Sequence, residues 1–370
     1  MTNVAANGAR PLAGPSDSGF SLDRVIGPDR LRALRERSDL MGLFLVVHAW
    51  VMILGAVALV VRWPNPFTFV LAVVIIGGRQ LGLAILMHDA AHRLLFRNAR
   101  VNDWVGTWCC GAPIAASLPL YRPYHLQHHR HTQQPEDPDL ILSAPFPITR
   151  ESFRRKMLRD LLGQTALRLR LEQVRAAMRQ PPKAAVPTAS ASATTVLGVT
   201  GDSDRTQSMQ TWHQRWAPWW RLIANERGFW ISNSLLLFGA TACGVAWAYF
   251  ALWLLPLLTW YQVITRVRNI AEHAVVGDPD DPLRNTRTTR AGWLARMIVA
   301  PYWVNYHLEH HLVVATPCWK LPRLHRWLIE AGQGAQMELA SGYGAVLRKA
   351  TARERDPPSF RQGPVSRSFF

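Results

Sequence analysis

Three short histidine-rich segments carry the residue types best suited to chemistry in this 370-residue chain. In the sequence His125-Leu-Gln-His-His-Arg-His131, a helix would place the first, fourth and fifth residues on one face. A hydrophobic core has no need for such a row of imidazoles. Neutral imidazole is a good ligand for zinc, copper, iron or nickel. We therefore interpret the segment as part of a metal site, with chance surface composition as the alternative.

Two further histidine segments make chance composition a weak explanation. Met87-His-Asp-Ala-Ala-His92 contains two histidines four residues apart, and His307-Leu-Glu-His-His311 repeats the spacing of the segment above. Because one zinc ion takes only three or four protein ligands, this number of histidines favours two metal ions. The candidate ligands are His88, His92, His125, His128, His129, His273, His307, His310 and His311.

Three carboxylates lie directly beside these histidines in the sequence, namely Asp89, Glu272 and Glu309. A metal-bound imidazole commonly donates its other ring N–H to a carboxylate, which fixes its tautomer and orientation. We expect the three acids to support the ligands in this way, with ordinary solvated acids as the alternative.

The histidines are expected to be positioned by membrane-spanning helices. Residues 40–61 contain no Asp, Glu, Lys or Arg, and residues 67–87 form a second apolar stretch after a tight turn. Residues 228–265 also lack charged side chains, and their 38 residues are enough for two crossings of a hydrocarbon core of about 30 Å. The sequence therefore predicts an all-α integral membrane protein with four transmembrane helices, which place the histidine segments on one side of the membrane.

The remaining segments are predicted to lie outside the bilayer. Residues 101–121 are interpreted as re-entrant or interfacial, because a crossing there would separate the first two histidine segments. We divide the chain into a disordered leader at 1–27 and a first half at 28–180, which holds an interfacial helix, two spans, two histidine segments and an Arg-rich surface helix. A low-complexity insertion follows at 181–207. The second half, 208–330, holds two spans and the third histidine segment. The chain then continues as a basic tail at 331–370, whose end is expected to be disordered.

The charge balance constrains partners and orientation. A formal net charge of +17 with 16 tryptophans is typical of apolar spans with basic and aromatic flanks. Anionic lipid or an acidic protein partner fits this balance, whereas the ordered basic and aromatic spacing of a nucleic-acid reader is absent. The predicted loops between paired spans hold few basic residues, so the positive-inside rule places the histidine segments and both termini in the cytoplasm.

One charged side chain, Arg79, falls inside the second predicted span. Two interpretations remain open: anchoring at the membrane interface, or contact with a polar or acidic end of a substrate. His48, inside the first span, is expected to have an interhelical hydrogen-bond partner instead of a metal.

The HDAAH, HLQHH and HLEHH segments, in this order among four predicted spans, resemble the membrane-bound fatty acid desaturase family over about residues 40–330. The resemblance implies a mushroom-like all-α fold with a cytosolic cap over two Fe ions. It also implies that the nine histidines hold these ions, and that the ions activate O2 to remove hydrogens from an unactivated C–H bond. Asn269 matches a position of the family that contacts the metal through a water molecule in some members. YRPYHLQHHRHT, DPDL and RNIAEH are similar to bacterial members grouped with dihydrorhizobitoxine desaturase.

The resemblance implies an O2-dependent desaturase that acts on an acyl chain or related alkyl substrate among membrane lipids. Electrons are expected from a separate ferredoxin or cytochrome b5 type donor, because no fused redox module is recognisable. Hydroxylases and ketolases share the same three segments and remain alternatives. A membrane metal transporter is a further alternative, although transporters place their ligands within the spans.

Overall fold

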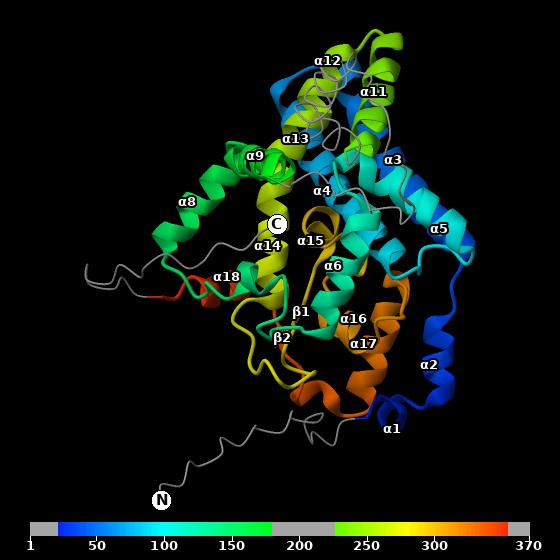
Figure 1. The fold of residues 1–370 in the computed structure, drawn as a ribbon, viewed down its shortest axis with the longest axis vertical. Helices are drawn as coiled ribbons and strands as arrows, with labels where there is room; N and C mark the ends of the chain where they lie inside the picture. The colour runs from blue at the N-terminus through cyan, green and yellow to red at the C-terminus, as the bar shows by residue number, and fades with distance from the viewer. Residues whose placement is uncertain (1–20, 180–225, 354–370) are drawn as a thin grey trace, which may run out of the picture.

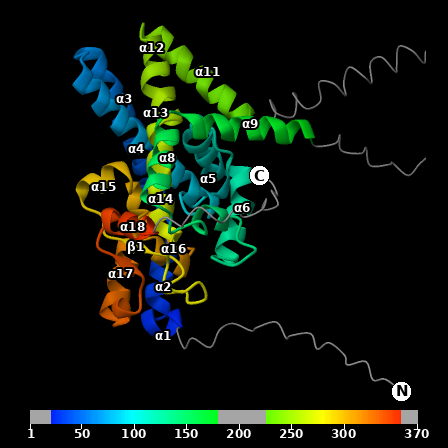
Figure 2. The same ribbon diagram turned by 90° about the vertical axis from the view of Figure 1, so that its left-hand side faces the viewer.

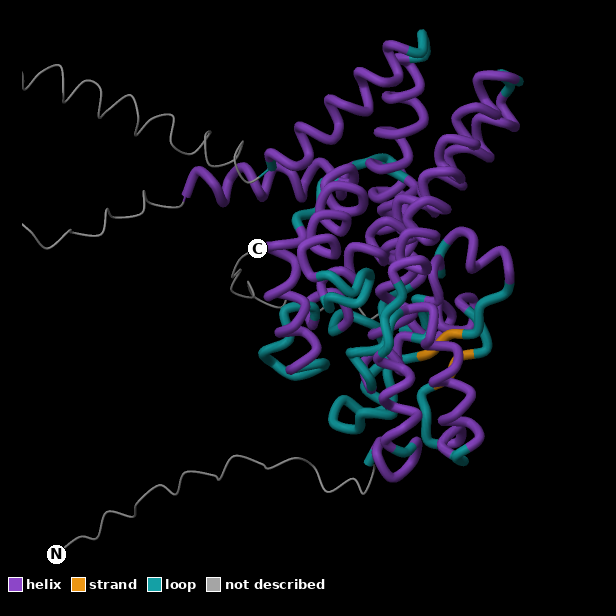
Figure 3. Tube along the Cα trace, turned by 90° about the vertical axis from the view of Figure 1, so that its right-hand side faces the viewer, coloured by secondary structure: helices purple, strands orange, loops and turns teal. Residues whose placement is uncertain are grey.

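The computed structural model describes residues 21–179 and 226–353, which are mostly helical (Figures 1 and 3). The sheet found among these residues is one parallel pair, β1 (Thr288–Thr289) beside β2 (Leu339–Ala340). The predicted helical class is therefore confirmed. The predictions for residues 1–20, the 181–207 insertion and the last 17 residues lie outside the described residues.

The first two predicted spans form an antiparallel hairpin, α3 (Asp39–Arg62) and α4 (Pro66–Ala91). The side chain of Asn65 accepts hydrogen bonds from two backbone N–H groups of the first turn of α4, which fixes the start of the helix. Both helices are long and apolar enough to cross a membrane. Much of α3 exposes large apolar side chains, as a helix beside lipid would: Leu43, Phe44, Val47, Val51 and Leu54.

The second hairpin differs in part from the two expected spans. α11 (Arg227–Ala242) has 16 residues, fewer than the roughly 20 that a spanning helix needs. After a turn at Gly244, α12 (Ala246–Ala248), η3 (Tyr249–Leu254), α13 (Leu255–Leu258) and α14 (Trp260–His273) form one long helical rod. Three helices of the described residues therefore qualify as membrane spans by length and composition: α3, α4 and this rod.

Shorter helices gather at the end of the hairpins where α4 and α14 finish (Figure 1). The elements of residues 101–121 are α5 (Ala99–Val105), the π-helix η1 (Gly106–Gly111), the 3-10 turn η2 (Ala112–Ile114) and the start of α6 (Leu118–Arg130). They do not form one continuous crossing, because the helical run that begins in α5 ends at Ala115, whose φ is 61°, before α6 starts. The other short elements are α7 (Leu140–Ser143), α15 (Trp293–Ile298), η4 (Pro301–Trp303), α16 (His307–Leu312), η5 (Cys318–Lys320), α17 (Leu321–Glu330) and η6 (Gln333–Ala335).

Both ends of the described chain contribute to the fold. α1 (Leu22–Ile26) lies within the expected leader, and α2 (Pro28–Arg35) was expected on the membrane surface. Instead, Leu31 and Leu34 of α2 belong to a buried apolar cluster with residues of α17, so this face contacts protein. In the predicted basic tail, β2 pairs with β1, and α18 (Tyr343–Ala350) packs against α14.

The Arg-rich segment forms two helices instead of one. α8 (Arg150–Leu161) and α9 (Gln164–Arg179) are separated at Gly163, whose φ of 71° favours glycine. α9 runs across the rod near α13 (Figure 2). The buried carboxylate of Asp160 in α8 pairs with Arg266 of α14, which ties this surface unit to the bundle.

Two glycines allow the segment α15–η4 to pack directly on α4. A Cβ atom at Gly78 would lie 2.7 Å from the carbonyl oxygen of Met297, and one at Gly82 would lie 2.7 Å from the ring of Tyr302. Larger residues at either position would push the segment away from the helix.

Candidate metal centre

The nine histidines converge where α4 and α14 end against α6 and α16. They form two groups, and within each group the ligand atoms all lie within 4.8 Å of one another. The five-histidine group comprises His88, His92, His125, His129 and His310, and the four-histidine group comprises His128, His273, His307 and His311.

α6 and α16 each supply both groups. His125 and His129 of α6 reach the five-histidine group, whereas His128 points to the other one. Adjacent helical residues differ by about 100° in direction, which separates His128 from His129. The three rings still lie together on one side of α6, as expected, with centroid distances of 4.5–5.7 Å, but they divide between two groups. The histidines of α16 divide in the same way: His310 belongs to the five-histidine group, and His307 and His311 belong to the four-histidine group.

The imidazole nitrogens of the five-histidine group are arranged to surround a point. The Nε2 atom of His125 lies 2.9 Å from Nε2 of both His92 and His129, and His129 Nε2 lies 2.9 Å from that of His310. One ring nitrogen has a single proton or a single lone pair, so it cannot make two good hydrogen bonds of this kind. Two nitrogens bound at about 2.1 Å to one ion at a right angle would be about 3 Å apart, so the spacing fits a metal site.

The four-histidine group shows the same arrangement. His307 Nε2 lies 2.8 Å from His273 Nε2 and 3.1 Å from His311 Nε2. Both ring nitrogens of His88, in the five-histidine group, are buried without a hydrogen-bond partner among the described residues. A bound cation would satisfy these atoms and the crowded Nε2 atoms of both groups.

Burial keeps these histidines in the form that binds metal. Burial, together with the nearby charge of Arg122, lowers the pKa of His92 to about 4. Burial and neighbouring histidines lower the pKa of His129 to about 2 and hold the pKa of His310 well below its usual value. The rings are therefore neutral at physiological pH and can donate a lone pair.

Two residues that were not predicted from the sequence contact the Nδ1 atoms of candidate ligands. Asp137 Oδ1 lies 2.7 Å from His128 Nδ1, and Thr132 Oγ1 lies 3.1 Å from His311 Nδ1. With Asp137 as acceptor, the proton of His128 sits on Nδ1, which leaves Nε2 free for metal. The signal in the sequence was the acidic, turn-rich loop Pro135-Glu-Asp-Pro-Asp139 immediately after the second histidine segment.

The three predicted carboxylates have different surroundings. Asp89 Oδ1 lies 3.5 Å from His88 Nδ1, and Glu272 Oε1 lies 3.7 Å from His307 Nδ1. Both acids are thus beside a candidate ligand. Glu309 is instead directed to Thr288 and His325, outside both groups, so its expected role behind a ligand is not supported by its contacts.

Asn269 lies on the wall of a small cavity that touches both groups. The cavity has a volume of about 40 Å³, enough for roughly one water-sized molecule. Its wall includes His125 from the five-histidine group and His128, His273 and His307 from the other. Tyr121 also lines it, with its ring stacked on His125 at a centroid distance of 5.0 Å.

Two arginines fix the helix ends that bear ligands. Arg122 donates to the backbone carbonyls of Ala90 and Ala91 at the end of α4, each at 2.9 Å. Arg287 serves the end of α14, where it donates to the carbonyls of Ala271, Ala274 and Val275. The last carbonyls of a helix lack internal partners and carry partial negative charge, so a guanidinium stabilises them.

The side chain of Arg79 is buried against protein. It is only 5% exposed and donates from Nη2 to the carbonyl of Met297 at 2.6 Å. Nine residues of helix separate it from His88, a net rotation of about 180°, so the two point to opposite sides of α4. His48 Nδ1 lies 3.1 Å from the hydroxyl of Tyr302, which confirms its expected interhelical partner.

Replacing Asp137 by asparagine is expected to weaken metal binding about 10- to 100-fold, because the new amide no longer favours the Nδ1 proton of His128. Metal content after dialysis against graded chelator measures the effect. Glu136→Gln in the same loop is the control, since the Glu136 side chain is exposed and only its backbone carbonyl accepts a bond, from Gln127. Equal metal loss in both variants would contradict this role of Asp137.

Comparison with known proteins adds two findings. The family model described as fatty acid desaturase matches residues 63–341. A curated relative, dihydrorhizobitoxine desaturase from Bradyrhizobium elkanii, is 26% identical over 300 residues, which cover 79% of this chain and 75% of the relative.

Proposed function

The chain belongs to the fatty acid desaturase family, and we propose that it is a membrane-bound, O2-dependent desaturase that introduces a C=C bond into an acyl chain or related alkyl substrate. The observation that carries the proposal is the pair of buried histidine groups facing one cavity. A desaturase named in the comparison is related over most of both chains, which favours desaturation over oxygen insertion.

We infer that each histidine group holds one iron ion. Imidazole is a suitable iron ligand, and the two groups provide five and four nitrogens without a carboxylate among them. Iron bound there would supply O2 activation and hydrogen abstraction. The protein contributes neutral ligands, a tautomer of His128 fixed by Asp137, and a small cavity that limits access of water. Asn269 lines the same cavity, which supports the proposal that it holds a water there.

A larger cavity offers a place for the apolar part of a substrate. It has a volume of about 310 Å³, and its walls include Trp108, Leu120 and Phe229. Leu120 immediately precedes Tyr121, which lines the small cavity between the histidine groups. We propose that an alkyl chain lies in the larger cavity while its reacting carbons reach the smaller one.

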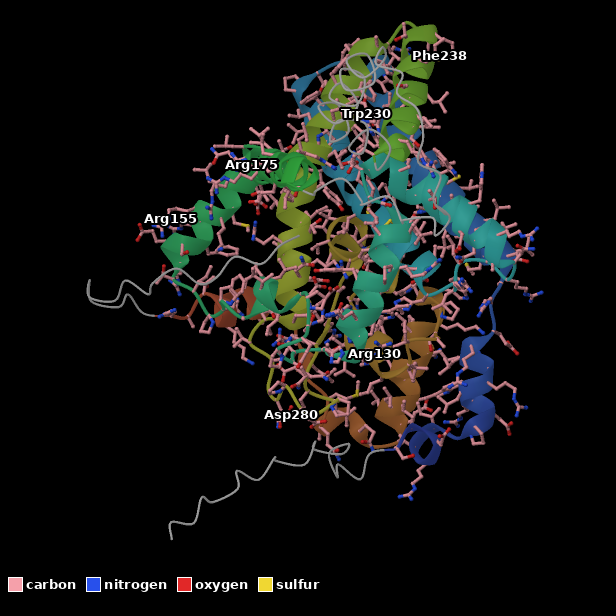
Figure 4. All side chains as sticks on the ribbon, in the orientation of Figure 1. Arg130, Arg155, Arg175, Trp230, Phe238 and Asp280 are labelled. Carbon is pink, nitrogen blue, oxygen red and sulfur yellow. The ribbon has the colours of Figure 1, made fainter. Side chains whose placement is uncertain are left out.

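The proposed membrane arrangement has four spans with the histidine groups and both termini on the cytoplasmic side. α11 would be the fourth span, although it is short. It exposes Trp230, Ile231, Leu235 and Phe238, and Figure 4 shows Trp230 and Phe238 along this helix. In this arrangement α3 and α11 run away from the histidine groups, while α4 and the rod that ends in α14 return to them.

The electron donor is proposed to dock near the end of α6. α5 and α8, which both carry exposed arginines, lie on opposite sides of Figure 1, so they do not form one basic docking face. Arg130 is exposed at the end of α6, next to His129, and is labelled in Figure 4. An acidic ferredoxin or cytochrome b5 would be attracted to this position.

With limiting donor, turnover is expected to fall as salt rises, because screening weakens attraction between exposed charges. Arg130→Glu should slow donor-limited turnover, whereas Arg155→Glu on the distant α8 should have little effect. A rate that does not change with salt or with the charge at residue 130 would contradict docking at this position.

Product analysis tests the proposed reaction. The product of candidate acyl or alkyl substrates is expected to be lighter than its substrate by two hydrogens, and no oxygen from labelled O2 should be retained. Mass spectrometry of reactions with and without O2 measures both. Labelled oxygen in the product would identify a hydroxylase or ketolase and overturn the proposed desaturation.

A further inference from the structure

A further cavity, distinct from the two described above, lies between α3, α4 and the α15–η4 segment, on the side of α4 opposite His88. Its volume is about 390 Å³. Its walls combine apolar side chains with two arginines, Arg79 and Arg296, and contain no acid.

Among the residues that the structure describes, no acid forms an ion pair with Arg79. Its hydrogen bonds go to the backbone carbonyls of Met297 and Arg296, and its guanidinium lies 5.5 Å from the centre of the Tyr302 ring. Burial raises the pKa of Tyr302 to about 12, so its phenol is neutral at physiological pH. A buried cation surrounded by neutral groups is costly, and an anion in the cavity would offset that cost.

The wall opposite α4 has a backbone conformation that is rare outside functional sites. Tyr302 and Trp303 both have positive φ, 51° and 58°. Such strain persists when the surroundings hold it in place. Here the hydroxyl of Tyr302 donates to the Leu45 carbonyl at 3.1 Å and contacts His48, while its ring packs on Gly82.

The cavity lies beside a segment suited to the membrane interface. α15 exposes Trp293 and Leu294, and Met297 is partly exposed on the same short helix. Arg296, also on α15, is exposed and lines the cavity. Tryptophan and arginine with apolar neighbours are typical of the level where lipid headgroups meet acyl chains.

We propose that this cavity binds the anionic headgroup of a membrane amphiphile, a phosphate or carboxylate, with its apolar chain against Phe44, Met52 and Ile75. Arg79 provides the buried charge and Arg296 the outer one. A guanidinium can donate two parallel hydrogen bonds to either anion. The site lies away from both histidine groups and goes beyond the proposed oxidation reaction.

Lipid-dependent stability tests this site without measuring turnover. Purified full-length protein in neutral detergent is titrated with phosphatidylglycerol, oleate, phosphatidylcholine or inorganic phosphate, and the thermal midpoint is followed. A ligand that binds the native state raises the midpoint, and the stabilisation grows with the logarithm of its concentration relative to its Kd. We expect phosphatidylglycerol, oleate or both to raise it, which also identifies the source of the anion, and phosphatidylcholine and phosphate to have little effect.

Arg79→Met should weaken the response to the anionic amphiphile at least about tenfold in concentration, since a charge-assisted hydrogen bond is lost. Arg100→Met, which removes an exposed charge on α5, is the matched control. Met52→Trp keeps Arg79 but fills the cavity, so it tests the site even if Arg79→Met fails to fold. An unchanged response in a folded Arg79→Met or Met52→Trp protein, or an equal response to phosphatidylcholine or inorganic phosphate, would overturn the proposal.

Discussion

Replacement of His310 by alanine is expected to abolish turnover and to reduce the iron content from about two ions per chain to one or fewer. His310 is buried, and its Nε2 lies 2.9 Å from that of His129, so its loss leaves a gap in the five-histidine group. Since losing even an outer partner of a ligand costs about 10- to 100-fold in affinity, losing the ligand should cost at least about 100-fold. Iron analysis and single-turnover assays measure the two effects.

His325→Ala is the matched control for that variant. His325 contacts Glu309 with its Nδ1 at 2.5 Å and belongs to neither histidine group. Its replacement should leave iron content near the wild-type value. A folded His310→Ala protein that retained full iron and activity would show that the five-histidine group is not a metal site.

Arg287→Met is expected to have the largest effect on stability. Arg287 is 2% exposed, donates to three carbonyls at the end of α14, and pairs with Glu338 at 3.0 Å. Removing one partner of a buried ion pair typically costs about 3–5 kcal/mol in the free energy of unfolding. The thermal midpoint in detergent should therefore fall by roughly 5–15 °C, and iron should be lost as His273 becomes less well held.

Arg290→Met removes a positive charge from the same strand region but from an exposed position. It should change the midpoint little, which separates the loss of buried hydrogen bonds from a general charge effect. Similar destabilisation by both variants would contradict the role assigned to Arg287 at the end of α14.

The histidines and the first two membrane helices could be predicted from local patterns. Spacings of three and four residues identify ligands on a helix, and uninterrupted apolar stretches identify α3 and α4. The division of His128 and His129 between two groups could not be predicted, because it depends on which helices pack on either side of α6. The supporting role of Asp137 depends in the same way on how the loop after α6 folds back.

The surroundings of Arg79 were also beyond prediction from local sequence. Position along the helix suggested an interface, but Met297, which accepts its hydrogen bond, is 218 residues away in the sequence. The prediction that α2 lies on the membrane surface was wrong for a similar reason. An amphipathic helix can pack its apolar face against protein as well as against lipid. The partner of α2, α17, begins almost 300 residues later.

The division of α16 between the two histidine groups has a consequence for biosynthesis. Each group needs at least one residue of the helix His307–Leu312, so neither is complete until the ribosome has made more than four-fifths of the chain. α4 and α6 are made much earlier, so their imidazoles lack these partners until the helix has been synthesised. The proposed iron ions could therefore be held by complete ligand sets only after residue 311 has been made, and a chain that ends before residue 307 would contain neither group in full.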